Sequence, residues 1–253
     1  MNYKVGIVGF GHVGGIMDRL FPNAIIYDEP KHIGTRAEIN NCDFVFVCVP
    51  TPKGKNGECD TSIIDDVLDW LYPVECIIIR STVPVGYTKI QYLLKGNVIF
   101  QPEYYGETVA HPFADPHNRT WITLGGTLNL TSKVAQLYQT VFTSELIINQ
   151  VDSDVAELAK YMENSFYSVK VTFCNQFYDL AKAMNIDYNQ LRETWLLDPR
   201  INRSHTFVYP DNRGYGGSCL PKDTASIINQ AEAYQIDMSL LKATEEANKR
   251  YHE

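Results

Sequence analysis

A single cysteine, Cys219, lies in the segment RGYGGSCLPKD, residues 213–223, between a glycine-rich turn and a Pro-Lys-Asp run. The glycines before it carry no side chains, so a substrate and a cofactor could approach the sulfur closely. Lys222 follows three residues later, and a nearby cation favours the reactive thiolate form of cysteine. An arbitrary cysteine is more often a small buried hydrophobe. The local sequence here instead favours a nucleophile.

A second motif with chemical meaning lies at the start of the chain, where an apolar run leads into VGFGHVG. Gly9, Gly11 and Gly14 have the G-x-G-x-x-G spacing of a dinucleotide-binding turn, which permits a tight turn, close approach of a pyrophosphate and close helix packing. The motif alone is a weak signal, because turn and packing glycines can produce it. Asp28, at the end of the next apolar run, strengthens it, since an acid there can bond a ribose hydroxyl. We expect cofactor contacts from Gly9, Gly11, His12, Val13, Gly14 and Asp28.

The acidic residues after the second apolar run also bear on the choice of cofactor. Asp28 and Glu29 would both repel a 2'-phosphate. The sequence therefore predicts NAD rather than NADP.

A nicotinamide enzyme needs a cysteine only for particular chemistry. Oxidation of an alcohol to an aldehyde requires no nucleophile. Oxidation of the aldehyde does, because the carbonyl carbon must first become tetrahedral, and an added thiolate makes a carbon that can lose hydride. The product is a thioester, which water cleaves. Cys219 together with the glycine motif therefore indicates a four-electron oxidation.

Further motifs follow in order along the chain: GFGHVG, VPTP at 49–52, STVPVG at 81–86, QPEYYGE at 101–107, ELAKYMEN at 157–164, DPRI at 198–201 and GYGGSCLPKD. In this series the chain resembles the UDP-glucose/GDP-mannose 6-dehydrogenase family over essentially its whole length. The resemblance implies NAD-dependent oxidation of the C6 alcohol of a sugar nucleotide to a carboxylate in two hydride transfers. UDP-glucose or a close relative is the expected substrate.

The resemblance also implies roles for the reactive residues. Cys219 matches the family nucleophile, and Asp223 matches the acid that positions a water or shares in proton removal. Lys160 and Asn164 match the pair that stabilises the alkoxide and the thiohemiacetal oxygen. Because these two residues are four apart on an expected helix, they share one face and can reach one oxygen.

Other matched positions are implied to surround the cofactor and the sugar. Glu103 matches a glutamate that assists thioester hydrolysis, and Thr82 a threonine near the nicotinamide and the catalytic water. Arg200 matches an arginine that reaches the sugar of a dimer partner. Taken alone, each has an ordinary explanation as a cap, a turn residue or a solvated charge. The implied cofactor set adds Pro50, Thr51, Ser81, Thr82, Glu107 and Lys222, and the implied substrate set is Glu103, Lys160, Asn164, Arg200, Gly216 and Cys219.

The chain also departs from the family pattern. The family continues into a further α/β domain that holds much of the nucleotide, whereas this sequence stops at KRYHE. A shortened polypeptide and a naturally short member are both open explanations. Because remote binding energy helps to position the reacting carbon, we expect weaker binding without that domain. Tyr87, Gln101 and the longer segment after Arg200 are local departures.

These residues require elements that position them. Residues 1–150 alternate short Val/Ile/Phe runs with helix-like stretches, which is typical of a Rossmann-like, doubly wound parallel sheet of the α/β class. We expect this part to bind NAD. Residues 151–253 are expected to form a helical central domain that carries the cysteine, with a long helix over 151–185 and helices at 187–197, 222–235 and 238–252. The apolar surface of the long helix suggests a homodimer.

Bulk composition excludes several classes of protein. The 253 residues include 45% hydrophobic and 21% charged residues, which is ordinary globular usage. A formal charge of -8 argues against nucleic-acid binding. The apolar runs are far shorter than the roughly 20 residues of a membrane span, and the N-terminus lacks signal-peptide zones. We therefore expect a cytoplasmic protein with reduced cysteines and no bound metal.

Two other functions remain open from the sequence. One is a two-electron hydroxyacid dehydrogenase, in which a lysine and an asparagine act without a cysteine; GYGGSCLPKD weighs against it. The other is a noncatalytic NAD-binding or dimerisation module that has lost its substrate domain. The NADH yield for each substrate molecule distinguishes all three.

Overall fold

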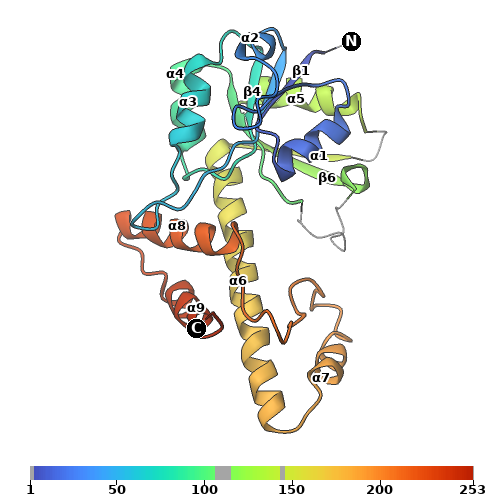
Figure 1. The fold of residues 1–253 in the computed structure, drawn as a ribbon, viewed down its shortest axis with the longest axis vertical. Helices are drawn as coiled ribbons and strands as arrows, with labels where there is room; N and C mark the ends of the chain where they lie inside the picture. Colours follow the sequence, from blue (N-terminus) through green and yellow to red (C-terminus); the bar gives the residue numbers. More distant parts are fainter. Residues whose placement is uncertain (1–2, 106–114, 143–145, 253) are drawn as a thin grey trace. The chain divides into compact units, whose positions relative to one another are not determined.

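The computed structural model describes residues 3–105, 115–142 and 146–252 (Figure 1). By its internal contacts the described chain divides into two compact units. The first unit contains residues 1–52 and 59–160, and the second contains residues 53–58 and 161–253.

A mostly parallel sheet forms the centre of the first unit. Among the described residues it has seven strands in the order β2-β1-β3-β4-β5-β6-β7. The strands are β1 (Val5–Val8), β2 (Ile25–Tyr27), β3 (Phe44–Val47), β4 (Cys76–Ile79), β5 (Val98–Phe100), β6 (Trp121–Gly125) and β7 (Ile147–Val151). All seven correspond to apolar runs from which strands were predicted.

Helices cover both faces of this sheet. One core combines strand residues such as Ile7 and Phe46 with Met17 of α1 (His12–Leu20) and Val134 of α5 (Leu128–Gln139). The other combines Val45 with apolar residues of α2 (Arg36–Ile39) and α3 (Ser62–Trp70). Strands such as β3 and β4 are apolar along their whole length because both faces are buried. The predicted doubly wound α/β fold is confirmed.

One pairing differs from a purely parallel sheet. β5 and β6 pair antiparallel at Phe100 and Gly125, while β6 and β7 are again parallel. A parallel neighbour needs a long crossover, usually a helix. Between β5 and β6 the described residues contain only a short 3₁₀ helix, Pro116–Asn118, whereas α4 (Tyr87–Lys95) connects the parallel strands β4 and β5.

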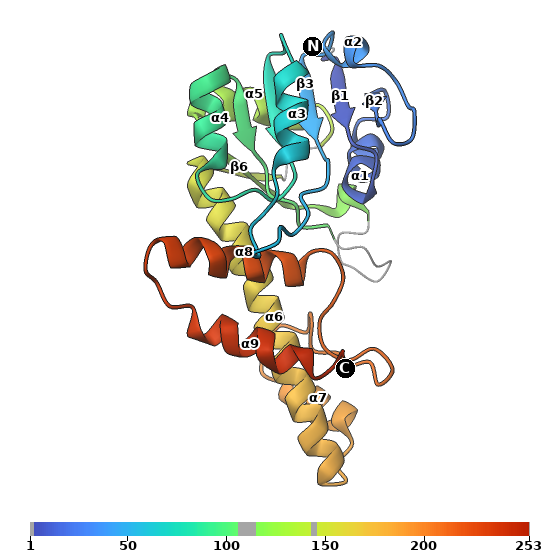
Figure 2. The same cartoon turned by 60° about the vertical axis from the view of Figure 1, so that its left-hand side comes forward.

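The second unit is built from helices. α6 (Ser153–Ala183) runs from the first unit into it, and α7 (Tyr188–Trp195), α8 (Leu220–Ala233) and α9 (Ser239–Lys249) follow. α8 and α9 pack on each other (Figure 2). Buried hydroxyl pairs join α6 to α8, with Ser168 Oγ 2.9 Å from Thr224 Oγ1. These helices lie close to the predicted ranges, and the separate roles assigned to residues 1–150 and 151–253 stay predictions. No helix in the described ranges has both the length and the apolar character for a membrane span.

Candidate active site

The glycine turn lies between β1 and α1, and the surrounding backbone explains two of its glycines. Gly9 has a φ of 89°, and a Cβ there would lie 2.9 Å from the Cys48 carbonyl. A Cβ on Gly14 would lie 2.0 Å from the Gly9 carbonyl oxygen. A Cβ on Gly11 would instead meet no atom within 4 Å. The fold therefore requires Gly9 and Gly14, while Gly11 keeps a space open in front of the turn.

The first turn of α1 can bind an anion. Its N-cap is Gly11, which has no side chain that could cap the helix or occupy the space in front of it. His12 and Val13 are the first two residues of the helix, so they lie directly beside this glycine. The positive end of the helix dipole at a helix N-terminus suits a phosphate. The residues present therefore fit the pyrophosphate of a dinucleotide.

Asp28 is held at the end of β2 beside the same turn. Its Oδ2 accepts the Phe10 N–H at 2.7 Å, and its Oδ1 accepts the Lys31 N–H at 3.0 Å. Each carboxylate oxygen can accept a further hydrogen bond, so a ribose hydroxyl still has an acceptor there. The neighbouring Glu29 pairs with Arg36 at 3.3 Å across an exposed surface. These positions fit the adenosine ribose of NAD.

The predicted residues after β3 and β4 are joined to one another. Thr51 Oγ1 donates to the Thr82 carbonyl at 2.8 Å, and Ser81 Oγ donates to the Val49 carbonyl at 2.5 Å. Pro50 lies between these contacts in the chain. The carboxyl ends of neighbouring parallel strands are where ligands bind in this class of fold. The structure thus brings together four of the predicted cofactor residues.

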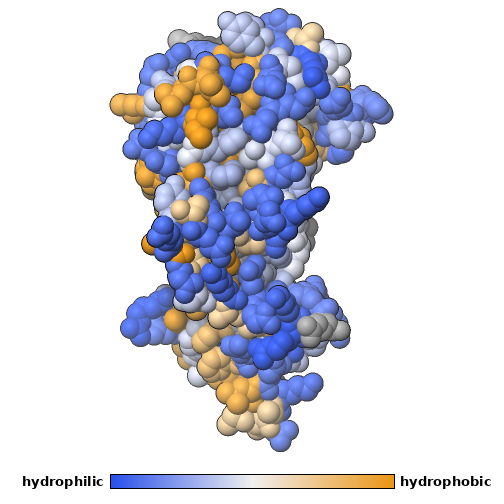
Figure 3. Space-filling model, turned by 90° about the vertical axis from the view of Figure 1, so that its left-hand side faces the viewer, coloured by the Kyte–Doolittle hydropathy of each residue, from blue (hydrophilic) through white to orange (hydrophobic). Residues whose placement is uncertain are grey.

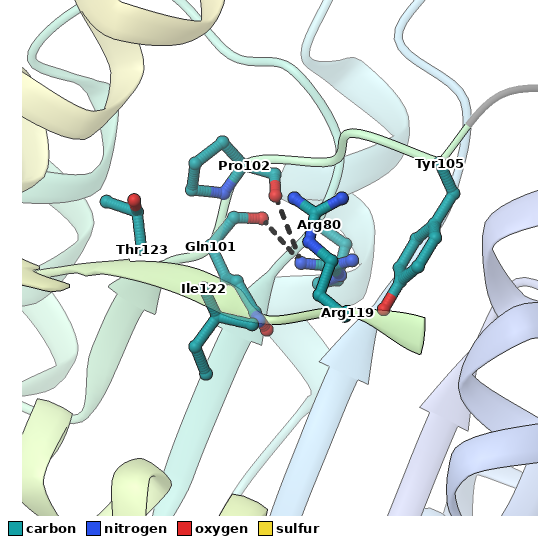
Figure 4. Close-up of a pocket in the computed structure, with 7 residues that line it drawn as sticks. All are labelled: Arg80, Gln101, Pro102, Tyr105, Arg119, Ile122 and Thr123. Carbon is teal, nitrogen blue, oxygen red and sulfur yellow. Dashed lines mark hydrogen bonds between the residues drawn. The ribbon is translucent and has the colours of Figure 1, made fainter. Parts of the chain in front are cut away.

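A buried ion pair positions Glu103, and its partner is a residue that the sequence did not predict. Arg80, which directly follows β4, is 3% exposed, and its Nη1 donates to the Gln101 and Pro102 carbonyls at 3.1 and 3.2 Å (Figure 4). Its Nη2 pairs with Glu103, whose other oxygen accepts the Tyr105 N–H. Burial, the largest single influence, acts to lower the pKa of Arg80, but the Glu103 carboxylate together with three weaker neighbours outweighs it, so this pKa is raised. The signal in the sequence was a charge at the end of the buried run CIIIR.

Aromatic rings connect Lys160 to the segment that carries Glu103. Lys160 is 9% exposed, and its Nζ lies 4.9 Å from the centroid of the Tyr104 ring. That ring lies 5.0 Å from the Trp121 ring. The Arg119 guanidinium packs on Tyr104, Tyr105 and Trp121 at 5.2, 5.1 and 4.3 Å. Cation–π contacts of this kind orient a buried cation.

In the second unit the structure joins the predicted catalytic residues Asp223 and Asn164, and Cys219 lies at the start of the helix that carries Asp223. Cys219 is exposed and forms the N-cap of α8. Asp223, in the first turn of α8, is buried and accepts from Asn164 Nδ2 of α6 at 2.5 Å. Lys222 Nζ pairs with the other oxygen of Asp223 at 2.5 Å. The cation expected to act on the thiol is thus bound to the neighbouring carboxylate.

The remaining predicted site residues lie in different places. Arg200 has an 85% exposed side chain that pairs with Asp198, two residues earlier. Gly216 lies in the turn before Cys219, where Gly214 and Gly217 have φ values of 71° and 77°. Glu107 falls outside the described residues. The position of Cys219 relative to the glycine turn stays a prediction, because the two belong to separate units.

Two family models match the chain. The NAD binding domain of the UDP-glucose/GDP-mannose dehydrogenase family matches residues 32–142, and the central domain of the same family matches residues 154–250. Together they cover most of the sequence. The chain belongs to the UDP-glucose/GDP-mannose dehydrogenase family. The predicted family and the predicted cofactor, NAD, are thereby confirmed.

Individual relatives agree with this family. A UDP-glucose 6-dehydrogenase of Rickettsia typhi is 34% identical over 230 residues, which are 84% of this chain and 50% of that protein. The chain thus spans about half the length of this relative. A solved UDP-glucose dehydrogenase from Pyrobaculum islandicum has a TM-score of 0.83 at 22% identity and covers 99% of this chain and 68% of its own. This likeness supports the fold.

The fold also extends beyond sugar-nucleotide enzymes. A 3-hydroxyisobutyrate dehydrogenase from Mycobacterium tuberculosis has a TM-score of 0.72 at 14% identity, covering 100% of this chain and 93% of its own. The architecture alone therefore does not select the substrate.

Proposed function

We propose that this chain is the NAD-binding and thiol-bearing part of a sugar-nucleotide 6-dehydrogenase that oxidises a C6 alcohol to a carboxylate. One observation carries the proposal. Cys219 lies exposed at the N-terminus of α8, and the first turn of that helix joins Asp223 to Asn164. A buried carboxylate and an amide donor, in the first turn of the helix that begins at an exposed thiol, suit acyl chemistry. A two-electron alcohol oxidation has no use for the thiol.

The first oxidation removes two electrons from the alcohol. NAD, when bound, accepts hydride in this step and in the later one. The hydroxyl proton leaves to water near Asp223, and Lys160 and Asn164 stabilise the developing alkoxide with a cation and an N–H donor. One aldehyde, one NADH and one proton result.

The second oxidation needs the thiol. The Cys219 thiolate forms a bond to the aldehyde carbon, and the electron pair of the carbonyl moves to oxygen, where Lys160 and Asn164 again stabilise it. Loss of hydride from that carbon gives a thioester. Water, oriented by Asp223 and Glu103, then adds to the thioester, the carbon–sulfur bond breaks, and the carboxylate is released with the thiolate restored.

The substrate follows from the family and its relatives, and we propose UDP-glucose or a close relative. The Rickettsia typhi relative carries the name UDP-glucose 6-dehydrogenase. This chain spans about half of that protein.

NADH stoichiometry tests the function. Purified chain is incubated with NAD and limiting amounts of UDP- and GDP-sugars, and NADH and uronate are both quantified. Two NADH for each uronate are expected with one or more of the sugars. NAD binding without NADH from any sugar would contradict the proposal and favour a noncatalytic module.

A two-electron hydroxyacid dehydrogenase is the second candidate. It stays a candidate because 3-hydroxyisobutyrate dehydrogenase has the same fold over 93% of its own chain. It predicts one NADH for each substrate molecule and full activity without the thiol. The same assay, run with small 3-hydroxy acids, separates the two candidates.

We also propose a homodimer formed across α6. Apolar side chains on this helix are exposed, including Met162 at 75% and Phe166 at 58%. Farther along it, Phe173, Phe177 and Leu180 are also exposed. Figure 3 shows apolar side chains gathered at the lower end of the helical unit. An exposed apolar surface of this kind is typical of an oligomer interface.

A further inference from the structure

The turn that carries Cys219 is held by a side chain with no role in the chemistry described above. Asn248 lies near the end of α9 and is 7% exposed. The N–H of Tyr215 donates to Asn248 Oδ1 at 2.8 Å, and Asn248 Nδ2 donates to the Tyr215 carbonyl at 2.8 Å. A carboxamide fits this double contact, since it presents one acceptor and one donor side by side. The Asn248 side chain thus forms hydrogen bonds with both the N–H and the carbonyl of Tyr215.

Two neighbouring features show that the surrounding residues are suited to the contact between Asn248 and Tyr215. The Tyr215 carbonyl also lies 2.9 Å from His252 Nε2, so its two acceptor positions are both used. A Cβ on Gly214 would lie 2.5 Å from Asn248 Oδ1, so glycine is what lets the amide approach the backbone. Tyr215 itself is 4% exposed. An unpaired backbone group at such a depth is costly.

The other end of the turn is held by α6. Asn175 Oδ1 accepts the Gly214 N–H at 3.1 Å and Arg213 Nε at 2.7 Å. Arg213 also pairs with Asp179, one helical turn farther along, at 2.7 Å. The turn is therefore tied to α6 at its start and to α9 at Tyr215. From Tyr215 the chain runs through only three residues to Cys219.

We propose that Asn248 is a positioning residue for Cys219, acting through the backbone of Tyr215. The inference rests on the proposed function, in which the sulfur must reach a carbonyl carbon. A turn fixed at Tyr215 limits the positions that the sulfur can take, and such orientation is worth far more to a bond-forming step than to binding. The first oxidation uses no thiol, so Asn248 matters for the second oxidation and little for the first.

Two substitutions at Asn248 remove different parts of this contact. Asn248→Asp keeps the size and the acceptor but loses the donor, and it directs an oxygen at the Tyr215 carbonyl. Asn248→Ala removes both hydrogen bonds. A carboxyl that takes up a proton regains a donor beside its acceptor, so acid should restore the contact in Asn248→Asp and leave Asn248→Ala unchanged. Asn189, exposed on α7 of the same unit, supplies the matched control as Asn189→Asp.

Hydrogen exchange tests the contact without any substrate. At pH 7, exchange in the peptide covering residues 213–219 should rise at least tenfold in both Asn248 variants, while α6 peptides stay at wild-type rates. Near pH 5, after correction for intrinsic rates, Asn248→Asp should return toward wild type, since a buried carboxyl has a raised pKa. Unchanged exchange at 213–219, or a rise throughout the second unit, would contradict the inference.

Trapping of the aldehyde tests the positioning role. With a sugar nucleotide that the wild type oxidises, hydroxylamine captures released aldehyde, and the ratio of NADH to uronate is measured. The Asn248 variants should lose at least tenfold in aldehyde oxidation but less than threefold in alcohol oxidation, so the ratio rises above two. Equal loss in both steps would contradict it. If the wild type forms no NADH, the proposed function fails, and the exchange measurement still decides whether Asn248 fixes the turn.

Discussion

At the scale of single residues, exposure separates Cys219 from the other cysteines. The six cysteines all lie in described residues, and Cys219 is exposed while the others are buried or half-buried. Burial raises the pKa of Cys42 to about 11 and that of Cys48 to about 12. Those thiols stay protonated at neutral pH, and a protonated thiol is a poor nucleophile.

We therefore expect one reactive thiol in the folded chain. Brief treatment with iodoacetamide at pH 7 should label Cys219, and mass spectrometry should find the other cysteines unlabelled. Labelling should abolish uronate formation, and Cys219→Ser should stop the reaction at or before the aldehyde, because no thioester can form. Two NADH for each sugar with Cys219→Ser would exclude the covalent route.

At the scale of elements, the glycines at the start of α1 have two different roles, one in packing and one in binding the cofactor. The space around Gly11 is open, whereas Gly14 contacts the Gly9 carbonyl. An added methyl group should therefore act on different properties at the two positions.

Gly11→Ala should weaken NAD binding at least tenfold, because its methyl group enters the space kept open for the pyrophosphate. Its free energy of unfolding should fall by no more than about 1 kcal/mol, the cost of a poorer N-cap. Gly14→Ala should lose about 1–3 kcal/mol of stability, since the backbone must shift. Calorimetric titration with NAD and urea unfolding measure the two effects. Equal NAD affinity in Gly11→Ala and wild type would count against the expected pyrophosphate site.

A buried carboxylate on α6 forms hydrogen bonds with the start of α4. Glu157 is fully buried, and its carboxylate accepts the Gly86 N–H at 2.6 Å and the Thr88 N–H at 2.9 Å at the start of α4. Burial raises the pKa of Glu157, and the two backbone N–H groups offset part of that rise. The folded state therefore holds the proton of this carboxyl more tightly than the unfolded state does.

The sign of the pH dependence follows from linkage. The contribution of Glu157 to stability is complete below its unfolded-state pKa of about 4.3 and is lost as pH rises through the raised folded-state pKa. The difference in unfolding free energy between wild type and Glu157→Gln should accordingly fall from pH 4 to pH 7. Urea titrations of both proteins at several pH values measure it. A difference that grows with pH would show that the two N–H groups outweigh burial.

The sequence was sufficient for regular elements and insufficient for long-range polar contacts. The runs FVFV and CIII predicted buried strands because their residue types are determined by the two covered faces. The antiparallel pairing of β5 and β6 at Phe100 was not predicted, because it depends on the connection between the two strands, whose sequence shows no helix or strand periodicity. Arg80 and Asn248 were missed for a related reason: their partners, which include backbone groups, are brought near by the fold, and no local spacing encodes such contacts.

At the scale of the whole molecule, the exposed apolar face of α6 argues for a partner. Met162 and Phe166 are four residues apart, so they lie on one side of the helix. A second copy of the chain would cover such residues in a symmetric contact.

We expect light scattering to give twice the chain mass of 28.8 kDa. Met162→Glu with Phe166→Glu should give a monomer, because two buried carboxylates would oppose each other across the contact. Lys182→Glu, on an exposed position of the same helix, changes charge without touching that face and should stay dimeric. A monomeric wild type at micromolar concentration would contradict the proposed homodimer.

The contacts of α9 with the cysteine turn also determine where the polypeptide can be dissected. A fragment ending at residue 247 would keep Cys219, Asp223 and the whole of α8, yet it would lack both Asn248 and His252, whose side chains reach the Tyr215 backbone. Such a fragment would retain every reactive group and lose the scaffold around one of them. Expression boundaries, fusion junctions and protease sites belong beyond His252.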